Sequence, residues 1–447
     1  MKKEIKVKNE QLYYNNVNLN SLAEKYGTPL KVTFLDLIKE RVVSLKETFD
    51  KVIKENNYQG KFIYLNANKA NYGVEEIETA FIYADGLECS SYHDLLLTVD
   101  IINKYPKMKT KPIVCNGYKK IDYITEIIKL SESGYNVSCI IDNALEYDLL
   151  NKYCHSRLEV GIRVHLEALY AEEDETIKND RFGVTSQEFD YILNDLENHQ
   201  NLILKTIHFH QRGFDYEKDK FEENICKTFE KYYVRANKKY PSCCEFDMGG
   251  GTPLPVHYDF DYSSWAKLLV DILKDLSITY GVTMPDIISE NGKYSQKDST
   301  INIYEIVGVK NTDEIPWYII DGSLLIAMPE AYALGEEILL HPVNNINDKM
   351  IKTRLAGITC DCDDIYYEKD KGYILMPEKT LDNKVFVAIL GTGSYQNSMN
   401  GKGGVHHCLI PEEKDLLIYT NNGKEIHKVR GELQEIEDME RILKFKK

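Results

Sequence analysis

The stretch FIYLNANKANYG, residues 62–73, places a lysine shortly after an apolar run. Its first four residues are hydrophobic, and Lys69 follows with three asparagines around it. Lysine normally lies on a wet surface, because burying its charge without a partner is costly. A lysine at the C-terminal tip of a buried strand therefore predicts either a solvated loop or an amine used for chemistry.

Strand-like apolar runs alternate with amphipathic stretches from this region to about residue 300. The runs are KFIYLNA, PIVCNG, VSCIID, LEVGIRV, LKTIHFH, CEFDMGGG and PDIISENG. Helical periodicity appears in GVEEIETAFIYA, YITEIIKLSESG and SSWAKLLVDILKDL. Repeated strand–helix alternation over ~250 residues predicts an α/β fold, a (β/α)8 TIM barrel.

Polar or glycine residues close each of these runs. In a barrel such strand ends meet at the C-terminal face, where catalytic side chains gather. The strand ends that we expect to converge there are Lys69, Asn116, Arg163, His210, Gly249 and Glu290.

The remainder of the chain has a different pattern. At 447 residues, the chain is long enough for more than one core. The runs STINIYEIVGVK, PWYIIDGSLL, EEILLHPV, TRLAGITCDC and KVFVAILGTG have few long helical spans between them. We therefore expect a barrel over 31–300, a mainly β domain over 301–447, and an N-terminal segment, 1–30, that contributes to the β domain.

Composition restricts the partners. The formal net charge of -16 argues against nucleic acid or an anionic membrane, because both bind clustered cations. No apolar run has the length of a membrane span, and the N-terminus lacks a secretory h-region. The ten cysteines lack the spacing of a disulfide framework, which favours a reducing cytoplasm.

A lysine in a barrel mouth is suited to form a Schiff base with an aldehyde such as pyridoxal 5'-phosphate. The phosphate requires backbone amides, which Gly249, Gly250 and Gly251 can offer, and a cation, for which Lys293 is the candidate. The pyridine nitrogen requires an acid, and Glu290 in ISENGK is placed to supply it. His210 in IHFHQRG is a candidate to stack on the ring.

The order NANKAN, VCNGYK, GIR, RFG, HFH, DMGGG, ISENGK, ITCDCDD and GTGSYQ resembles the fold-type III pyridoxal-phosphate decarboxylases of basic amino acids. Within them it is most similar to the biosynthetic arginine decarboxylases of polyamine biosynthesis, through IVCNGYK, ITCD and MPEAYALGEEILLHPV. The resemblance implies an alanine racemase-like barrel, a C-terminal β domain and a homodimer with shared active sites.

It also implies residue roles. Lys69 carries the cofactor, His210 stacks on its ring, and Glu290 pairs with its pyridinium. Cys360 of the other subunit protonates the carbanion, and Asp361 binds the cationic end of the substrate. The remaining cofactor contacts that it implies are Arg163, Gly249, Gly250, Gly251 and Tyr395.

The chain departs from the family in ways that bear on the substrate. Gln211, Arg212 and Gly213 follow the stacking histidine where the family has Gly-Ser, and Lys293 stands in place of an arginine. The chain is also shorter than the usual arginine decarboxylase. Arg212 is either a surface residue or a binder of an extra substrate carboxylate, as for an acid-conjugated amino acid in siderophore or antibiotic biosynthesis.

The expected reaction is decarboxylation of a basic amino acid, with arginine favoured over ornithine and lysine. Diaminopimelate decarboxylase, an amino-acid racemase and a catalytically inactive regulatory homologue remain alternatives. Glu290 and Cys360 favour decarboxylation over racemisation, and Asp361 stands where diaminopimelate decarboxylases have glutamate.

We expect no metal site at His406, His407 and Cys408, since adjacent side chains of a strand point to opposite faces. Magnesium is reported for the family, but no residue of the sequence indicates a site for it.

Overall fold

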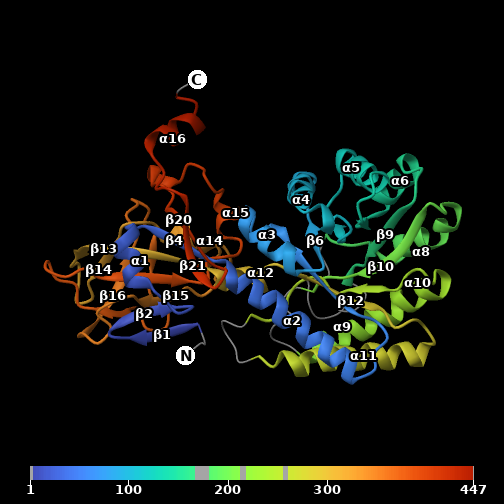
Figure 1. The fold of residues 1–447 in the computed structure, drawn as a ribbon, viewed down its shortest axis with the longest axis horizontal. Helices are drawn as coiled ribbons and strands as arrows, with labels where there is room; N and C mark the ends of the chain where they lie inside the picture. Colours follow the sequence, from blue (N-terminus) through green and yellow to red (C-terminus); the bar gives the residue numbers. More distant parts are fainter. Residues whose placement is uncertain (1–3, 167–180, 212–217, 255–259, 446–447) are drawn as a thin grey trace. The chain divides into compact units, whose positions relative to one another are not determined.

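The computed structural model describes residues 4–166, 181–211, 218–254 and 260–445 (Figure 1). The chain divides into two compact units. One is Lys39–Ser295, and the other combines Met1–Ile38 with Gln296–Lys447.

The unit Lys39–Ser295 contains a closed barrel of eight parallel strands, which confirms the TIM barrel expected from the sequence. Around the barrel the strand order is β10-β11-β12-β5-β6-β7-β8-β9, so consecutive strands pair and the last strand, β12, closes the barrel on the first, β5. The strands are β5 (Phe62–Ala67), β6 (Gly86–Cys89), β7 (Ile113–Cys115), β8 (Val137–Ile141), β9 (Leu158–Arg163), β10 (Leu202–His208), β11 (Glu245–Asp247) and β12 (Asp286–Asn291).

Strand β6 has no counterpart among the apolar runs of the sequence. It is only four residues long, and one of them is Glu88, so neither length nor hydrophobicity distinguishes it. It pairs with β5 through Leu65 and Gly86, and with β7 through Leu87 and Ile113. A Cβ at Gly86 would lie 2.3 Å from the carbonyl oxygen of Pro112, so this close approach requires glycine.

Helices surround the barrel strands (Figure 1). Their apolar faces and the outward side chains of the strands share one large core. A separate cluster of strand side chains, Ile63, Leu65, Val114, Ile140 and Ile288, fills the barrel itself. Several helices begin at side-chain caps, for example Ser91 before α4 and the capping box of Thr185 and Glu188 before α8. The described helices are α2 (Leu35–Glu55), α3 (Val74–Tyr83), α4 (Tyr92–Lys104), α5 (Ile121–Glu132), α6 (Ala144–Tyr153), α8 (Ser186–Asp195), α9 (Lys218–Thr228), α10 (Val234–Lys239), α11 (Tyr262–Tyr280) and α12 (Lys293–Gln296).

The other unit is mainly β, as expected. Its ten-stranded sheet follows the order β17-β16-β14-β13-β4-β20-β21, with β15, β18 and β19 off this path. The strands are β4 (Leu30–Phe34), β13 (Thr300–Lys310), β14 (Trp317–Ile320), β15 (Leu339–Pro342), β16 (Met350–Ala356), β17 (Ile365–Tyr366), β18 (Ile374–Pro377), β19 (Phe386–Leu390), β20 (Lys414–Asn421) and β21 (Lys424–Gly431). By its hydrogen bonds, β4 belongs to this sheet.

An antiparallel sheet of three short strands adds the N-terminal segment to the same unit. Its strands are β1 (Ile5–Lys8), β2 (Gln11–Tyr14) and β3 (Val17–Asn18). The Leu12 amide donates to the Val343 carbonyl at 2.8 Å, which attaches β2 beside β15 (Figure 1).

The helices of this unit are short. They are α1 (Leu19–Tyr26), α13 (Leu324–Ala327), α14 (Pro329–Leu334), α15 (Gln396–Asn400) and α16 (Ile436–Ile442). Across the described ranges of both units, no helix combines the length and apolarity needed to cross a bilayer.

Candidate active site

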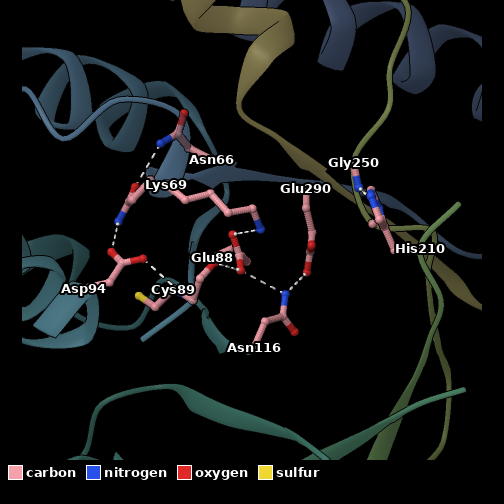
Figure 2. A network of polar contacts seen from close by, with 12 residues as sticks. Asn66, Lys69, Glu88, Cys89, Asp94, Asn116, His210, Gly250 and Glu290 are labelled. Carbon is pink, nitrogen blue, oxygen red and sulfur yellow. Dashed lines mark hydrogen bonds and ion pairs between the residues drawn. The ribbon is translucent and has the colours of Figure 1, made fainter. Parts of the chain in front are cut away.

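Lys69 lies in the 3-10 turn η1 (Asn68–Ala70), directly after β5. Its Nζ is 2.9 Å from Oε2 of Glu88, on the neighbouring strand β6 (Figure 2). The Glu88 side chain is 0% exposed and that of Lys69 40% exposed. The amine is therefore held by a buried carboxylate and remains accessible from one side.

The surrounding asparagines hold the turn in place. Asn66 Nδ2 donates to Asn68 Oδ1 at 2.9 Å, and Asn68 Nδ2 donates to Thr98 Oγ1 of α4 at 2.8 Å. Asn71 Oδ1 accepts from the Gly73 amide at 2.8 Å, just before α3. Hydrogen bonds to adjacent elements thus fix the backbone that carries Lys69.

Glu88 accepts hydrogen bonds on both carboxylate oxygens. Besides Lys69, the Ser90 hydroxyl donates to it at 2.8 Å and Asn116 Nδ2 at 3.1 Å. Burial raises the pKa of Glu88, but the Lys69 charge and these hydrogen bonds outweigh burial and lower the pKa below its ordinary value. Glu88 is therefore ionised at neutral pH.

Asn116 links Glu88 to Glu290 across the barrel mouth. The same Nδ2 donates to Glu290 Oε1 at 2.6 Å (Figure 2). Burial, followed by the nearby Asp247 carboxylate, raises the pKa of Glu290 to about 8. Asn116 Oδ1 is buried and has no hydrogen-bond partner among the described residues, so it is an acceptor suited to a bound group.

A second buried pair belongs to the neighbouring strands. His208 Nδ1 lies 3.3 Å from Asp247 Oδ2, and both side chains are almost wholly buried. Burial lowers the pKa of His208 to about 4 and raises that of Asp247 to about 7. Ligand-type atoms of His208, Asp247 and Glu290 lie within 4.8 Å of one another. At neutral pH His208 is uncharged, so it offers Glu290 no cationic partner.

The glycine loop after β11 is fitted closely to His210. Gly249 has φ 68°, and a Cβ there would lie 2.6 Å from His210 Nδ1. The Gly250 amide donates to the same nitrogen at 3.2 Å, and the Gly249 amide donates to Asp247 Oδ1 at 2.8 Å. Gly251 has φ 98°. Two of the three amides expected to bind phosphate therefore already have protein acceptors.

Arg163 ends β9, with Nη1 3.6 Å from Asp142 Oδ1 and its guanidinium 4.5 Å from the Phe182 ring centroid. Lys293 begins α12 and directly follows Gly292. A Cβ at Gly292 would lie 2.6 Å from the Cβ of Ala70, so the backbone before Lys293 lies close to the turn that carries Lys69. Both cations thus lie at strand ends of the barrel unit, as expected for residues near the site.

Three of the expected site residues belong to the other unit. Cys360 and Asp361 lie between β16 and β17, and Tyr395 precedes α15 with φ 64°. Cys360 Sγ is 3.1 Å from Cys408 Sγ, and the interaction with Cys408 raises the pKa of Cys360. Arg212, the proposed extra carboxylate binder, lies outside the described residues.

Sequence reasoning missed Glu88 and gave no role to Asn116. The only signal for Glu88 was its place after the turn glycine in ADGLECSS. It also missed Asp94, which accepts from the Ser90 amide at 2.9 Å. Burial and the nearby Glu88 carboxylate raise the pKa of Asp94 to about 7.

Together these groups can hold an aldehyde and a ring with a basic nitrogen. Lys69 offers an amine that can act as a nucleophile, Glu88 is a carboxylate that can accept its proton, and Glu290 is a second carboxyl group in reach of Asn116.

Comparison with known proteins agrees with this chemistry. The family model "Pyridoxal-dependent decarboxylase, pyridoxal binding domain" matches residues 37–296. The biosynthetic arginine decarboxylase of Pseudomonas putida is 25% identical over 418 residues, which cover 87% of this chain and 62% of that protein. The biosynthetic arginine decarboxylase of Vibrio cholerae is 24% identical over 330 residues, which cover 68% of this chain and 50% of that protein. The chain thus spans less than two thirds of the length of these curated relatives.

Solved structures share the fold. The biosynthetic arginine decarboxylase from Campylobacter jejuni superposes with a TM-score of 0.84 at 18% identity, over 99% of this chain and 89% of that one. A diaminopimelate decarboxylase from M. jannaschii, in co-complex with L-lysine, has a TM-score of 0.80 at 18% identity, over 98% and 97%. At such identities these likenesses concern the fold.

Proposed function

Because this chain belongs to the family of pyridoxal-dependent decarboxylases, we propose that it removes the α-carboxylate of a basic amino acid as carbon dioxide and yields the corresponding amine. The family model describes a pyridoxal-binding domain, which confirms the cofactor expected from the sequence. The observation that carries the proposal is the network of Lys69, Glu88, Asn116 and Glu290 at one end of the barrel.

The residues present fit pyridoxal phosphate. Lys69 supplies the amine for its aldehyde, and Glu88 takes up the proton that this amine must lose. Asn116 Oδ1 is a buried acceptor for a polar group of the cofactor. When bound, the cofactor supplies an electron-accepting ring that stabilises the negative charge left by carbon dioxide loss.

Glu290 is the group assigned to the ring nitrogen. Its pKa of about 8 reflects burial and the nearby Asp247 carboxylate, which outweigh the charge of Lys69. A protonated ring nitrogen beside it would favour the ionised carboxylate, and Asn116 holds that carboxylate by a 2.6 Å hydrogen bond. Glu290 would thereby keep the ring nitrogen protonated during the reaction.

A basic substrate is supported by the surroundings of Asp361. An open cavity of about 900 Å3 lies in the β unit. Its lining contains six carboxylates, one of which is Asp361, and two lysines. Such a lining attracts a guanidinium or ammonium group and disfavours an anionic one. Asp361 itself is half-buried, so an ion pair with a substrate cation would be only partly screened by water.

Cys360 is proposed as the acid that returns a proton to the substrate carbon. Its raised pKa keeps the thiol protonated at neutral pH, which is the state that a proton donor needs. We assign Cys360 and Asp361 to the barrel site of a second copy of the chain, in a homodimer.

Arginine is the substrate that the curated relatives favour, since both of those described above are named for it. Ornithine and lysine are the other basic substrates within this proposal.

The test is release of carbon dioxide from arginine, ornithine, lysine and diaminopimelate, with added pyridoxal phosphate. We expect turnover of a basic amino acid, fastest with arginine, and none above background in Lys69→Ala. Turnover of diaminopimelate alone would refute the basic-substrate proposal. Full activity of Lys69→Ala, or no turnover together with no absorption band from a lysine-bound cofactor, would refute the reaction.

A further inference from the structure

A cluster of metal-ligand side chains lies outside the barrel, in the β unit. Cys360 Sγ is 3.1 Å from Cys408 Sγ, and the Cys360 amide donates to Cys408 Sγ at 3.4 Å. A ring nitrogen of His407 completes a group of three donor atoms within 4.8 Å of one another. All three side chains are exposed.

From the sequence we expected no metal site here, because we assigned His406 to Cys408 to a strand, in which adjacent side chains point to opposite faces. In the structure His407–Leu409 forms the 3-10 turn η7, in which Cys408 has φ 57° and Leu409 φ 52°. This left-handed turn brings His407 and Cys408 to one side. His406 is buried and is not among the three donors.

The donor set indicates which cation it would bind. Two thiolates and an imidazole suit Zn2+ and similar thiophilic divalent ions, whereas Mg2+ requires oxygen ligands. In a tetrahedral zinc site the two sulfurs lie ~3.8 Å apart. The sulfurs of Cys360 and Cys408 are 3.1 Å apart, so rotation of the two side chains needs to separate them by only several tenths of an ångström. An amide donating to a ligand sulfur, as that of Cys360 does to Cys408, is a typical supporting contact.

Asp361 is near enough to take part. Its Oδ2 lies 3.6 Å from His407 Nε2, and its Oδ1 accepts from the Asp363 amide at 2.9 Å. A carboxylate in this position can complete the coordination or orient the imidazole.

We propose that Cys360, His407 and Cys408 form a binding site for one thiophilic divalent cation, of which Zn2+ is the representative. Each thiol loses its proton to solvent as its sulfur binds, so one cation displaces two protons and no group is oxidised. No comparison or sequence motif assigned this site.

The site has a consequence for catalysis. A metal-bound Cys360 has no thiol proton to donate, so Zn2+ and proton donation exclude each other. We therefore expect Zn2+ to inhibit turnover reversibly. The binding claim is independent of the proposed reaction, whereas the inhibition claim rests on it.

The test uses the untagged, cofactor-loaded protein in a thiol-free reductant. Zn2+ is titrated by calorimetry, and Co2+ is added as a probe whose visible bands report tetrahedral thiolate coordination. We expect one Zn2+ per chain, about two protons released, and tetrahedral Co2+ bands. Cys408→Ser and His407→Ala should weaken binding at least ~10-fold.

Cys362→Ser is the matched control. Cys362 is exposed and only two residues from Cys360, but it groups with Asp361 and Asp363 rather than with Cys408. Its loss should leave stoichiometry and affinity unchanged. Equal loss of binding in Cys362→Ser, or wild-type binding in Cys408→Ser, would overturn the assignment.

Two other outcomes would also overturn it. If no Zn2+ binds and mild peroxide instead joins Cys360 to Cys408, detected as a loss of two mass units, the pair is a redox couple and not a metal site. If the wild type shows only weak binding that Cys408→Ser shares, the ion is adventitious. Normal turnover with saturated Zn2+ would refute the inhibition claim alone.

Discussion

Lys69 and Glu88 form an ion pair of 2.9 Å in which only the lysine is accessible. Lys69 lies in the turn directly after β5 and Glu88 lies on the neighbouring strand β6, and we propose that their pairing gives the amine a proton acceptor. This relationship leads to the first of five predictions.

Replacement of Glu88 by glutamine removes that acceptor while keeping size and hydrogen bonding. We expect kcat to fall ~10–100-fold, because the Lys69 amine then releases its proton to water. The optimum of kcat against pH should move downward, because without the neighbouring carboxylate the Lys69 amine loses its proton at lower pH, and a purely structural role would not cause this shift. An unchanged pH profile with normal cofactor binding would contradict the role of Glu88. Circular dichroism and thermal unfolding serve as the folding controls.

Glu290 predicts a pH dependence of stability for the cofactor-free protein. Its pKa is about 8 when folded and 4.5 in its ordinary state, so the unfolded chain releases the proton first as pH rises. Stability should therefore be greatest below about pH 4.5 for this group, and decline by at most about 5 kcal/mol as pH rises through about 8.

Urea unfolding of the cofactor-free protein at several pH values measures this decline. Glu290→Gln should show a shallower slope, because its neutral side chain cannot ionise. A separate decline from Asp247, whose pKa is raised to about 7, should persist in the variant. Identical slopes for wild type and variant would show that Glu290 is ionised in the folded protein already.

Gly249→Ala tests the loop against His210. The new Cβ would meet His210 Nδ1 at 2.6 Å, so the imidazole must move from its contact with Gly250. We expect the affinity for pyridoxal phosphate to fall at least ~10-fold, measured by cofactor absorbance. Gly281→Ala is the control, since Gly281 also has positive φ, 62°, but nothing lies within 4 Å of its Cβ position. Equal effects in both variants would point to backbone strain alone.

The homodimer with shared active sites that we propose predicts complementation between inactive variants. Lys69→Ala and Cys360→Ala should each be inactive alone. After dissociation and mixing, half of the dimers are mixed and each contains one intact site, so roughly a quarter of wild-type activity should return. If both residues served a site within one chain, mixing would restore nothing.

Lys119 and Glu146 form a buried ion pair outside the reaction. Lys119 Nζ lies 3.2 Å from Glu146 Oε2 and donates to the Gly117 carbonyl at 2.8 Å. Lys119→Met leaves a buried carboxylate unpaired and should cost ~3–5 kcal/mol in urea unfolding.

The matched control is Lys129→Met, which removes an exposed pair with Glu126 at 3.0 Å and should cost under ~0.5 kcal/mol. Equal costs would mean that solvent reaches the Lys119 pair.

The sequence predicted the barrel because buried parallel strands leave long apolar runs with polar ends. It did not reveal β6, since a four-residue strand containing Glu88 lacks the run that signals burial. It also placed His407 and Cys408 in a strand, whereas the structure places them in a left-handed 3-10 turn that depends on backbone angles rather than on a pattern of side chains.

Local sequence therefore determined which elements form and which residues can supply an amine, an acid or a thiol. The partners of those residues were decided by tertiary structure. Glu88 meets Lys69 because β6 pairs with β5, and Asn116 meets Glu290 only because the barrel closes, bringing together positions 174 residues apart. Cys360 and Cys408, 48 positions apart, likewise meet only in the folded β unit. Burial and neighbouring charge, which set each pKa, depend on the same long-range contacts, and spacing along the chain does not encode them.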